Sequence, residues 1–127
     1  MAETDGGGAV VLVADDEEDL RTIMTIRLEQ AGFEVETAGD GHEAYDRLTD
    51  DSPPVEGLLL DLNMPLMGGL ELLERLADHR QRPYTVVFSG YDDSDGREAA
   101  FDLGADEFLV KPFSPADLAT SLAERIG

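Results

Sequence analysis

The sequence predicts an α/β fold in which five parallel strands form a single sheet with helices on both faces. Five short apolar runs alternate with five amphipathic segments along the 127 residues, and the stretches between them are short. Strands and helices that alternate in this way are typical of a parallel sheet covered on both sides. The length fits one domain with its own core, and the sequence contains no repeat, long linker or second domain.

The apolar runs differ in pattern, and the pattern indicates their places in the sheet. Residues 9–14, 57–60 and 84–88 are rich in Val, Leu and Phe with few polar interruptions, as expected for strands buried on both faces. Residues 33–38 alternate apolar with polar side chains, which indicates a strand nearer an edge. The fifth run covers residues 107–110.

The amphipathic segments are expected to be helices. The first has an apolar stripe at helical spacing and ends at Ala31-Gly32. The second and third cover about residues 41–49 and 69–79, and the fourth, near residues 93–103, is weak because Gly96 interrupts it. The fifth opens with Ser114 as N-cap, followed by proline, and runs to about residue 126. The stripe of the first helix comprises Leu20, Ile23, Met24, Ile26, Arg27 and Leu28.

The composition is strongly acidic. The chain has 29 Asp and Glu against 9 Lys and Arg, a formal net charge of −20. This charge argues against direct binding to a nucleic-acid backbone or to an anionic membrane surface. Lysine occurs once, and all other basic side chains except histidine are arginine. Such a composition resembles that of proteins from salt-accumulating halophiles, so we expect a halophilic source.

The cysteine content, the N-terminal segment and the length of the apolar runs indicate the cellular compartment. Cysteine is absent, which excludes disulfides and thiolate metal sites. Residues 1–8 are acidic and glycine-rich, lack the features of a signal peptide and are expected to be flexible. No apolar run approaches the length of a membrane span. We therefore expect a cytoplasmic domain that covers residues 9–126.

The residues that directly follow the apolar runs form the candidate site, because ligands of such sheets bind at the carboxyl ends of the strands. Asp15 and Asp16 follow the first run, Asp61 the third, Ser89 the fourth and Lys111 the fifth. Three carboxylates held together repel one another. A hard cation with open coordination positions relieves that repulsion, and oxygen ligands of this kind suit Mg²⁺.

Each of these residues also has an ordinary structural explanation. Asp15 and Asp16 are placed to cap the helix that follows them, and Ser89 is a common turn residue before glycine. Lys111 fits a surface lysine whose stem lies along apolar side chains. Capping does not explain Asp61, however, and the joint arrangement is far more specific than its parts.

The joint arrangement predicts phosphoryl chemistry. A carboxylate beside Mg²⁺ can act as a nucleophile toward a phosphoryl group and form an aspartyl phosphate. The metal and an ammonium group neutralise charge on the transferring oxygens, and a hydroxyl can hydrogen-bond an oxygen of the product. The strand ends supply all of these groups.

On these residues the chain resembles the response-regulator receiver domains of two-component signalling systems, in particular chemotaxis-type regulators. The resemblance covers roughly residues 9–126 and implies a doubly wound (βα)5 flavodoxin-like fold. It rests on Asp15-Asp16, Asp61-Leu-Asn-Met-Pro65, Ser89-Gly90 and Phe108-Leu-Val-Lys-Pro112.

The resemblance implies that Asp61 accepts a phosphoryl group from a sensor histidine kinase or a phosphotransfer protein. It implies a Mg²⁺ cofactor held by Asp16, Asp61 and the backbone carbonyl of Asn63, with Asp15 acting largely through water. The domain would act in signalling, not as an enzyme, and would catalyse only its own phosphorylation and dephosphorylation. It would be a monomer or a phosphorylation-dependent dimer.

The resemblance also implies a conformational switch. Ser89 would be the switch hydroxyl, Phe108 the switch aromatic and Lys111 the cation that contacts the phosphoryl group. Phosphorylation would change the surface of the fourth helix, fifth strand and fifth helix, which would contact a downstream protein or an output domain. The Lys111–Pro112 bond would be cis.

The sequence departs from the family pattern at three positions. Gly68 stands where an acidic loop residue is usual, which is expected to loosen the start of the third helix. Phe108 lacks the hydroxyl of a tyrosine, so its switching would depend on packing alone. Tyr91 and Asn63 occupy the positions that line access to the phosphoryl group, and the bulk of Tyr91 predicts an unusual phosphoryl lifetime.

Two other classes of protein fit less well. A phosphatase of the haloacid-dehalogenase type also uses Asp, Ser or Thr, Lys and Mg²⁺, but its nucleophile follows the first strand. A flavodoxin-like cofactor binder would need Ser, Thr and Gly after the first strand, where this chain has acids that repel a phosphate. Within the receiver interpretation, the chain is either complete or part of a longer regulator with an output domain.

The charge predicts that the fold depends on salt. The screening length is about 10 Å at about 0.1 M ionic strength and falls to about 3 Å at about 1 M, so only concentrated salt suppresses most of the surface repulsion. We expect the thermal midpoint of unfolding to rise steeply from low salt to molar KCl. The rise should exceed that of a receiver domain near neutral charge, and a thermal scan followed by circular dichroism measures it.

Cation binding at the acidic residues can contribute to such a rise, so the scan is repeated with Asp16→Asn. A midpoint that stays flat over the whole range in both proteins would contradict the halophilic interpretation of the composition.

Overall fold

The computed structural model describes residues 7–50, 53–78, 82–90 and 94–126. Tyr91 and most of the glycine-rich N-terminal segment lie outside these ranges. Within them, all five predicted strands and all five predicted helices are present. In chain order they are β1 (Val10–Ala14), α1 (Glu18–Gln30), β2 (Glu34–Ala38), α2 (Gly41–Leu48), β3 (Gly57–Asp61), α3 (Gly69–Leu76), β4 (Tyr84–Ser89), α4 (Ser94–Asp102), β5 (Glu107–Val110) and α5 (Pro115–Ile126).

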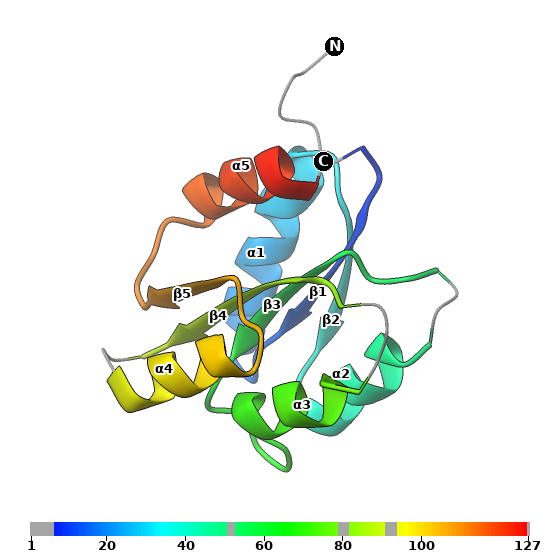
Figure 1. Cartoon of the computed structure of the whole chain (residues 1–127). Helices are drawn as coiled ribbons and strands as arrows, with labels where there is room; N and C mark the ends of the chain where they lie inside the picture. Colours follow the sequence, from blue (N-terminus) through cyan, green and yellow to red (C-terminus); the bar gives the residue numbers. More distant parts are fainter. Residues whose placement is uncertain (1–6, 51–52, 79–81, 91–93, 127) are drawn as a thin grey trace.

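The five strands form one parallel sheet in the order β2-β1-β3-β4-β5. Helices α1 and α5 cover one face of the sheet, and α2, α3 and α4 cover the other (Figure 1). The predicted doubly wound α/β fold is therefore confirmed. The alternating run at residues 33–38 is the edge strand β2, as its pattern predicted.

Two hydrophobic clusters, one on each face of the sheet, hold the layers together. There are two because successive side chains of a strand point to opposite faces. From β1, Val11 and Val13 pack with α1 and α5, whereas Leu12 and Ala14 pack with α2, α3 and α4. All five residues of β1 are buried, as are all five residues of β3. The two central strands thus have almost no solvent contact along their length, and their carboxyl ends are fixed from both sides.

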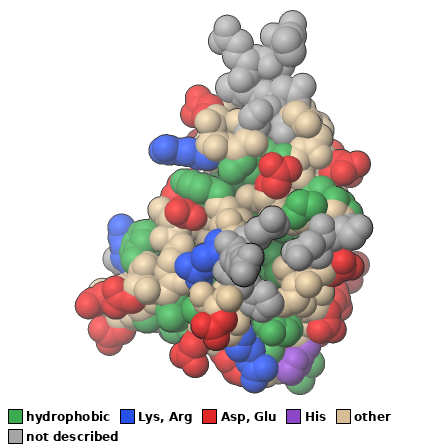
Figure 2. Space-filling view, turned by 45° about the vertical axis from the view of Figure 1, so that its right-hand side comes forward, with side chains coloured by type: hydrophobic (Ala, Val, Ile, Leu, Met, Phe, Trp, Pro, Cys, Tyr) green, Lys and Arg blue, Asp and Glu red, His purple; other side chains and the backbone are tan. Residues whose placement is uncertain are grey.

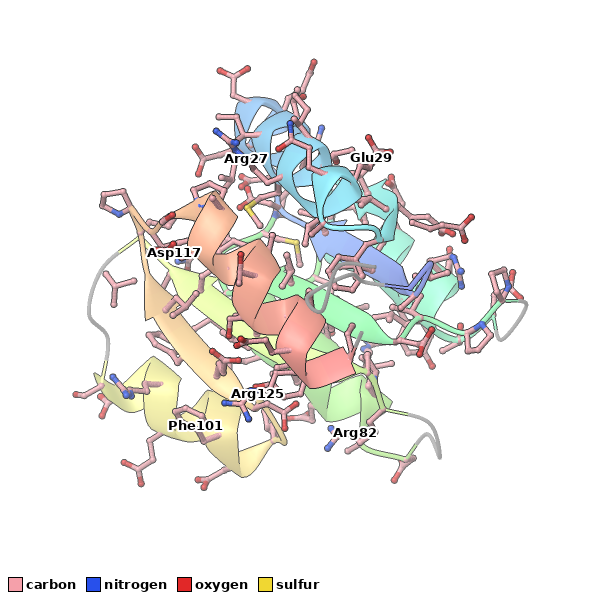
Figure 3. The ribbon with its side chains drawn as sticks, turned by 90° about the horizontal axis from the view of Figure 1, so that it is seen from above. Arg27, Glu29, Arg82, Phe101, Asp117 and Arg125 are labelled. Atoms are coloured by element: carbon pink, nitrogen blue, oxygen red, sulfur yellow. The ribbon has the colours of Figure 1, made fainter. Side chains whose placement is uncertain are left out.

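The apolar stripe of α1 is narrower than the sequence predicted. Met24 and Leu28, one turn apart, are buried, but Ile23 and Ile26 are 47% and 49% exposed. In Figure 3, α1 with Arg27 and Glu29 lies beside α5 with Asp117 and Arg125. The sheet and α5 cover one side of α1, so apolar residues on its flanks remain in solvent.

The N-cap residues of three helices can be compared with what the sequence predicted. Ser114 accepts a hydrogen bond from the backbone N–H of Asp117 at 3.1 Å, which confirms the predicted N-cap of α5. The N-cap of α1 is Glu17, whose side chain makes no capping bond, so neither aspartate of the acid pair caps this helix. Gly68 is the N-cap of α3 and supplies no side-chain acceptor.

The surface is acidic, and Figure 2 shows Asp and Glu side chains over the face in view with basic side chains scattered among them. On the described surface, Arg47 pairs with Glu36 and Arg75 pairs with Glu71. Acids outnumber bases about threefold in the whole sequence, so most carboxylates depend on water and counterions. Of the helices that the structure describes, none combines the length and the apolar character needed to cross a bilayer.

Gly41, the first residue of α2, allows the loop between β3 and α3 to pack against this helix. A Cβ atom at Gly41 would stand 2.8 Å from the backbone carbonyl carbon of Met67, which is itself buried in the core. Since backbone atoms have to move to admit it, we expect Gly41→Ala to lower the free energy of unfolding by about 1–3 kcal/mol. Urea denaturation at fixed salt measures the change.

Gly90→Ala is the matched control, because its added methyl group meets no atom within 4 Å. Its free energy of unfolding should stay within about 0.5 kcal/mol of wild type. Equal stabilities of the two variants would contradict the close packing of α2 against the loop.

Candidate functional site

The parallel register brings the predicted site residues to one edge of the sheet. Ala14 pairs with Leu60, so the residues that follow them, Asp15 and Asp61, lie next to each other across β1 and β3. The strand order reverses at this pair, since β2 continues on one side of β1 and β4 on the other side of β3. Ligands of open α/β sheets bind at such a reversal.

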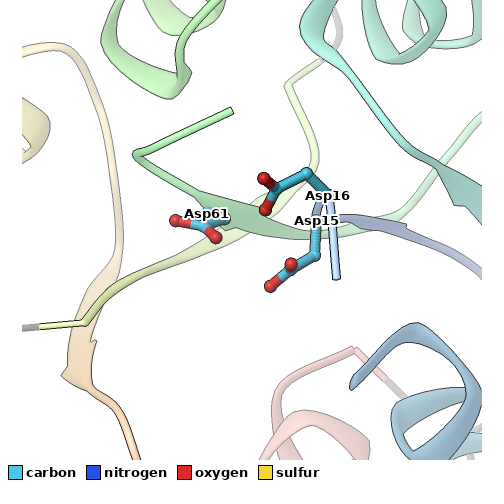
Figure 4. Close-up of side chains that lie close together, drawn as sticks. All are labelled: Asp15, Asp16 and Asp61. Carbon is cyan, nitrogen blue, oxygen red and sulfur yellow. The ribbon is translucent and has the colours of Figure 1, made fainter. Parts of the chain in front are cut away.

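The three aspartates form a compact cluster. Ligand oxygens of Asp15, Asp16 and Asp61 all lie within 4.8 Å of one another. Asp15 and Asp61 are buried, whereas Asp16 is exposed. Figure 4 shows the three side chains grouped at the carboxyl ends of β1 and β3. The cluster therefore has a buried base and one side that solvent reaches.

Lys111 places its ammonium group in this cluster. Its Nζ lies 3.1 Å from Asp15 Oδ2, 3.1 Å from Asp61 Oδ2 and 2.7 Å from Glu17 Oε1. The side chain is only 18% exposed and Nζ lies 5.3 Å from the ring centroid of Phe88, so Lys111 is not an ordinary surface lysine. The peptide bond from Lys111 to Pro112 is cis, as predicted.

The carboxylates determine the protonation of Lys111. Burial by itself would lower the pKa of the ammonium group. Hydrogen bonds to Glu17 and Asp61, together with the contact to Asp15, outweigh that effect and raise the pKa above its ordinary value. Lys111 is therefore a permanent positive charge at neutral pH.

Asp15 is the most constrained of the three aspartates. Burial and the negative charge of Asp61 raise the pKa of its carboxyl group, while the Glu17 backbone N–H and Lys111 oppose the rise. Asp15 Oδ1 accepts a hydrogen bond from the Glu17 N–H at 2.7 Å. Asp15 Oδ2 is buried and has no hydrogen-bond partner among the described residues, although the ammonium group stands 3.1 Å away.

These features fit a divalent cation. The cluster holds three carboxylates, and the Lys111 ammonium group contacts two of them, Asp15 and Asp61. A buried carboxylate oxygen is left without a hydrogen-bond donor among the described residues. A hydrated divalent cation would supply both the missing charge and a water donor for Asp15 Oδ2. Oxygen ligands with an open, solvent-facing side favour a metal that keeps several waters.

Asp61 is oriented by two donors. Its Oδ1 accepts a hydrogen bond from the Asn63 N–H at 2.9 Å, and its Oδ2 accepts one from Lys111 at 3.1 Å. Ser89, at the end of β4, is buried and pairs with Val110 in the ladder to β5. The backbone continues this pairing, because the N–H of Lys111 donates to the Ser89 carbonyl at 2.7 Å.

Phe108 lies on β5 and is almost fully buried. The guanidinium carbon of Arg97, on α4, stands 5.8 Å from the centre of the Phe108 ring and 5.9 Å from that of Phe101. Such distances allow cation–π attraction to both rings. The aromatic side chain predicted to take part in switching is therefore packed under α4.

The sequence did not reveal two contacts of the site. Arg21, on α1, donates a hydrogen bond to the backbone carbonyl of Asp15 at 2.6 Å and so fixes the turn after β1. Glu17, which in the sequence is one of several adjacent acids, contacts Lys111. In the sequence, the contact of Arg21 with Asp15 is signalled at most weakly, by a basic residue that follows shortly after an acid pair. The second joins residues 94 positions apart, which spacing alone does not reveal.

Comparison with known proteins gives a consistent result. A family model described as the response regulator receiver domain matches residues 11–123. The transcriptional regulatory protein SrrA of Staphylococcus aureus is 33% identical over 108 residues, which cover 85% of this chain and 44% of that protein. The chain thus spans less than half the length of these curated relatives.

Solved structures agree with this match. A CheY-like response regulator receiver domain protein from Methanospirillum hungatei JF-1 is 27% identical, with a TM-score of 0.85 over 93% of both chains. The chemotaxis protein CheY4 of Vibrio cholerae is 30% identical, with a TM-score of 0.80 over 94% of this chain and 98% of its own. Because the family match extends from β1 into α5 and so includes the whole strand edge described above, the chain belongs to the response-regulator receiver domains of two-component signalling systems.

Proposed function

We propose that residues 9–126 form a receiver domain in which Asp61 accepts a phosphoryl group from a sensor histidine kinase or a phosphotransfer protein. The observation that carries the proposal is the contact of one ammonium group with two buried carboxylates at the reversal of strand order. Lys111 Nζ lies 3.1 Å from both Asp15 and Asp61. The domain acts in signalling and turns over only its own phosphoryl group.

Asp61 is the nucleophile because it is both buried and oriented. The Asn63 N–H and the Lys111 ammonium group each hold one of its oxygens. The carboxylate is therefore already ordered, and it loses less conformational entropy when it reacts. An oxygen of Asp61 forms a bond to phosphorus as the bond from phosphorus to the donor breaks. Lys111 then offsets the negative charge on the phosphoryl oxygens.

The cofactor we propose is Mg²⁺, held by Asp16, Asp61 and the backbone carbonyl of Asn63, with Asp15 acting largely through water. When bound, Mg²⁺ neutralises charge on the carboxylates and on the transferring oxygens. The buried Asp15 Oδ2, which has no hydrogen-bond partner among the described residues, and the exposed position of Asp16 support this assignment. Arg21 supports it indirectly, because it fixes the turn that carries the acid pair.

The output we propose is a shift between two conformations, favoured by new contacts to the phosphoryl group. Ser89 would donate to a phosphoryl oxygen and Phe108 would change its packing, which would alter the surface of α4, β5 and α5. The buried position of Phe108 under Arg97 supports this route, since a change at either residue affects the other.

The partners and setting are proposed in the same way. The altered surface acts on a downstream protein or on an output domain, without direct contact to nucleic acid or membrane. The domain is cytoplasmic and is a monomer or a phosphorylation-dependent dimer. The net charge of −20 supports both the exclusion of polyanionic partners and a halophilic source.

Asp61→Asn should abolish phosphorylation, because an amide is not a nucleophile toward phosphorus. Wild-type protein incubated with acetyl phosphate and Mg²⁺ should gain one acid-labile phosphoryl group by intact mass, and the variant should gain none. Chelation of Mg²⁺ should stop the wild-type reaction. Labelling of Asp61→Asn at the wild-type rate would show that the acceptor lies elsewhere.

Lys111→Arg should uncouple phosphorylation from the change at α4. A planar guanidinium group does not replace a compact ammonium group in a pocket shared by three carboxylates. We expect amide exchange in residues 94–110 to respond to beryllofluoride in wild type but only slightly in the variant.

Arg75→Lys is the control for this exchange of basic residues, since Arg75 forms an exposed pair with Glu71 on α3. It should respond to beryllofluoride like the wild type. A full response of Lys111→Arg would remove the role assigned to the ammonium group.

A further inference from the structure

Glu17 has the closest contact to the Lys111 ammonium group. Its Oε1 lies 2.7 Å from Nζ, compared with 3.1 Å for the oxygens of Asp15 and Asp61. Glu17 is the N-cap residue of α1, yet its carboxylate makes no capping bond. The side chain thus reaches across to the end of β5 and leaves the start of its own helix without a side-chain cap.

The three carboxylates around Lys111 differ in their freedom to move. Asp15 and Asp61 are buried, and backbone N–H groups hold one oxygen of each. The Glu17 side chain is 61% exposed, and apart from its ion pair with Lys111 it is the backbone N–H, bonded to Asp15, that ties Glu17 to the site. Glu17 is therefore the partner that Lys111 can exchange without unfolding the strand edge.

We propose that Glu17 is a positioning residue that competes with the phosphoryl group for Lys111. In the unphosphorylated protein its carboxylate holds the ammonium group, and phosphorylation requires Lys111 to release it. This inference rests on the proposed role of Asp61 as acceptor. It adds a restraint on the reaction that is built into the turn between β1 and α1.

The competition follows from the charge changes in the reaction. An oxygen of Asp61 forms a bond to phosphorus, and the bond from phosphorus to the bridging oxygen of acetyl phosphate breaks. Acetate leaves with the electron pair, and no proton is transferred. The new phosphoryl group carries negative charge beside Asp61, so it attracts Lys111 and repels the Glu17 carboxylate. Lys111 has to give up its ion pair with the Glu17 carboxylate in order to contact the phosphoryl group. The free energy of the phosphorylated state is therefore higher when Glu17 is present.

Glu17→Gln and Glu17→Asp test this proposal together. Glutamine keeps the length of the side chain but removes its charge, whereas aspartate keeps the charge but shortens the reach toward Lys111. We expect both variants to be phosphorylated by acetyl phosphate about two- to fivefold faster than wild type at saturating Mg²⁺, the range that a partly exposed ion pair supports. Beryllofluoride should bind both more tightly by a similar factor.

The alternative is that Glu17 merely repels an anionic donor as part of the acidic surface. Glu18→Gln removes the same charge from the next residue, which is exposed and lines the hollow between α1 and β2. It should react at the wild-type rate. Glu17→Asp also separates the two explanations, because simple repulsion predicts no acceleration when the charge is kept.

A double-mutant cycle with Lys111→Ala completes the test. If Glu17 acts through Lys111, the acceleration by Glu17→Gln disappears in the Lys111→Ala background. Equal acceleration in both backgrounds, or acceleration by Glu18→Gln equal to that by Glu17→Gln, overturns the proposal. If Lys111→Ala does not fold, as circular dichroism would show, the Glu17→Asp result decides.

The wild-type and Asp61→Asn reactions keep this inference separate from the proposed function. Labelling of wild type but not of Asp61→Asn, with unchanged rates in both Glu17 variants, overturns the competition and leaves the acceptor intact. Labelling of both proteins at one rate overturns the acceptor and with it the inference.

Discussion

The structure depends on the attraction between one ammonium group and the carboxylates at the end of β1 and β3. Like charges this close are costly when they are buried, and an unpaired buried charge is among the most destabilising features a core can contain. Lys111 makes the arrangement possible because its ammonium group lies equally close to Asp15 and to Asp61. It comes from the other end of the sequence, directly after β5. The end of β5 is thereby tied to the ends of the central strands.

The hydrophobic layers make this attraction effective. Burial of β1 and β3 on both faces removes water from below the cluster, so the charges interact through protein and not through solvent. The same burial leaves Asp15 Oδ2 without a hydrogen-bond donor among the described residues. Packing thus buries negative charge that the single positive charge of Lys111 compensates only in part. A divalent cation would compensate the rest.

Most of the fold was predictable because its local and long-range signals agree. Buried parallel strands require continuous apolar runs, and Ser114 followed by proline marked the start of α5. The proximity of Asp15, Asp16, Asp61 and Lys111 was predictable because strand ends converge in such a sheet. Side-chain exposure was less predictable, since the stripe containing Ile23 and Ile26 does not reveal how much of α1 the sheet and α5 cover. Contacts between distant loops, such as that of Glu17 with Lys111, depend on packing that periodicity does not encode.

The scarcity of lysine has a spectroscopic consequence. Lys111 is the only lysine of the chain, and its side chain lies against Phe88 and three carboxylates. A sample isotopically labelled in lysine alone would give side-chain resonances from a single residue, with no assignment needed. The shift of those resonances would report occupancy of the strand edge by cations or phosphoryl groups directly. The composition of this protein thus supplies a one-residue probe at its most highly charged position.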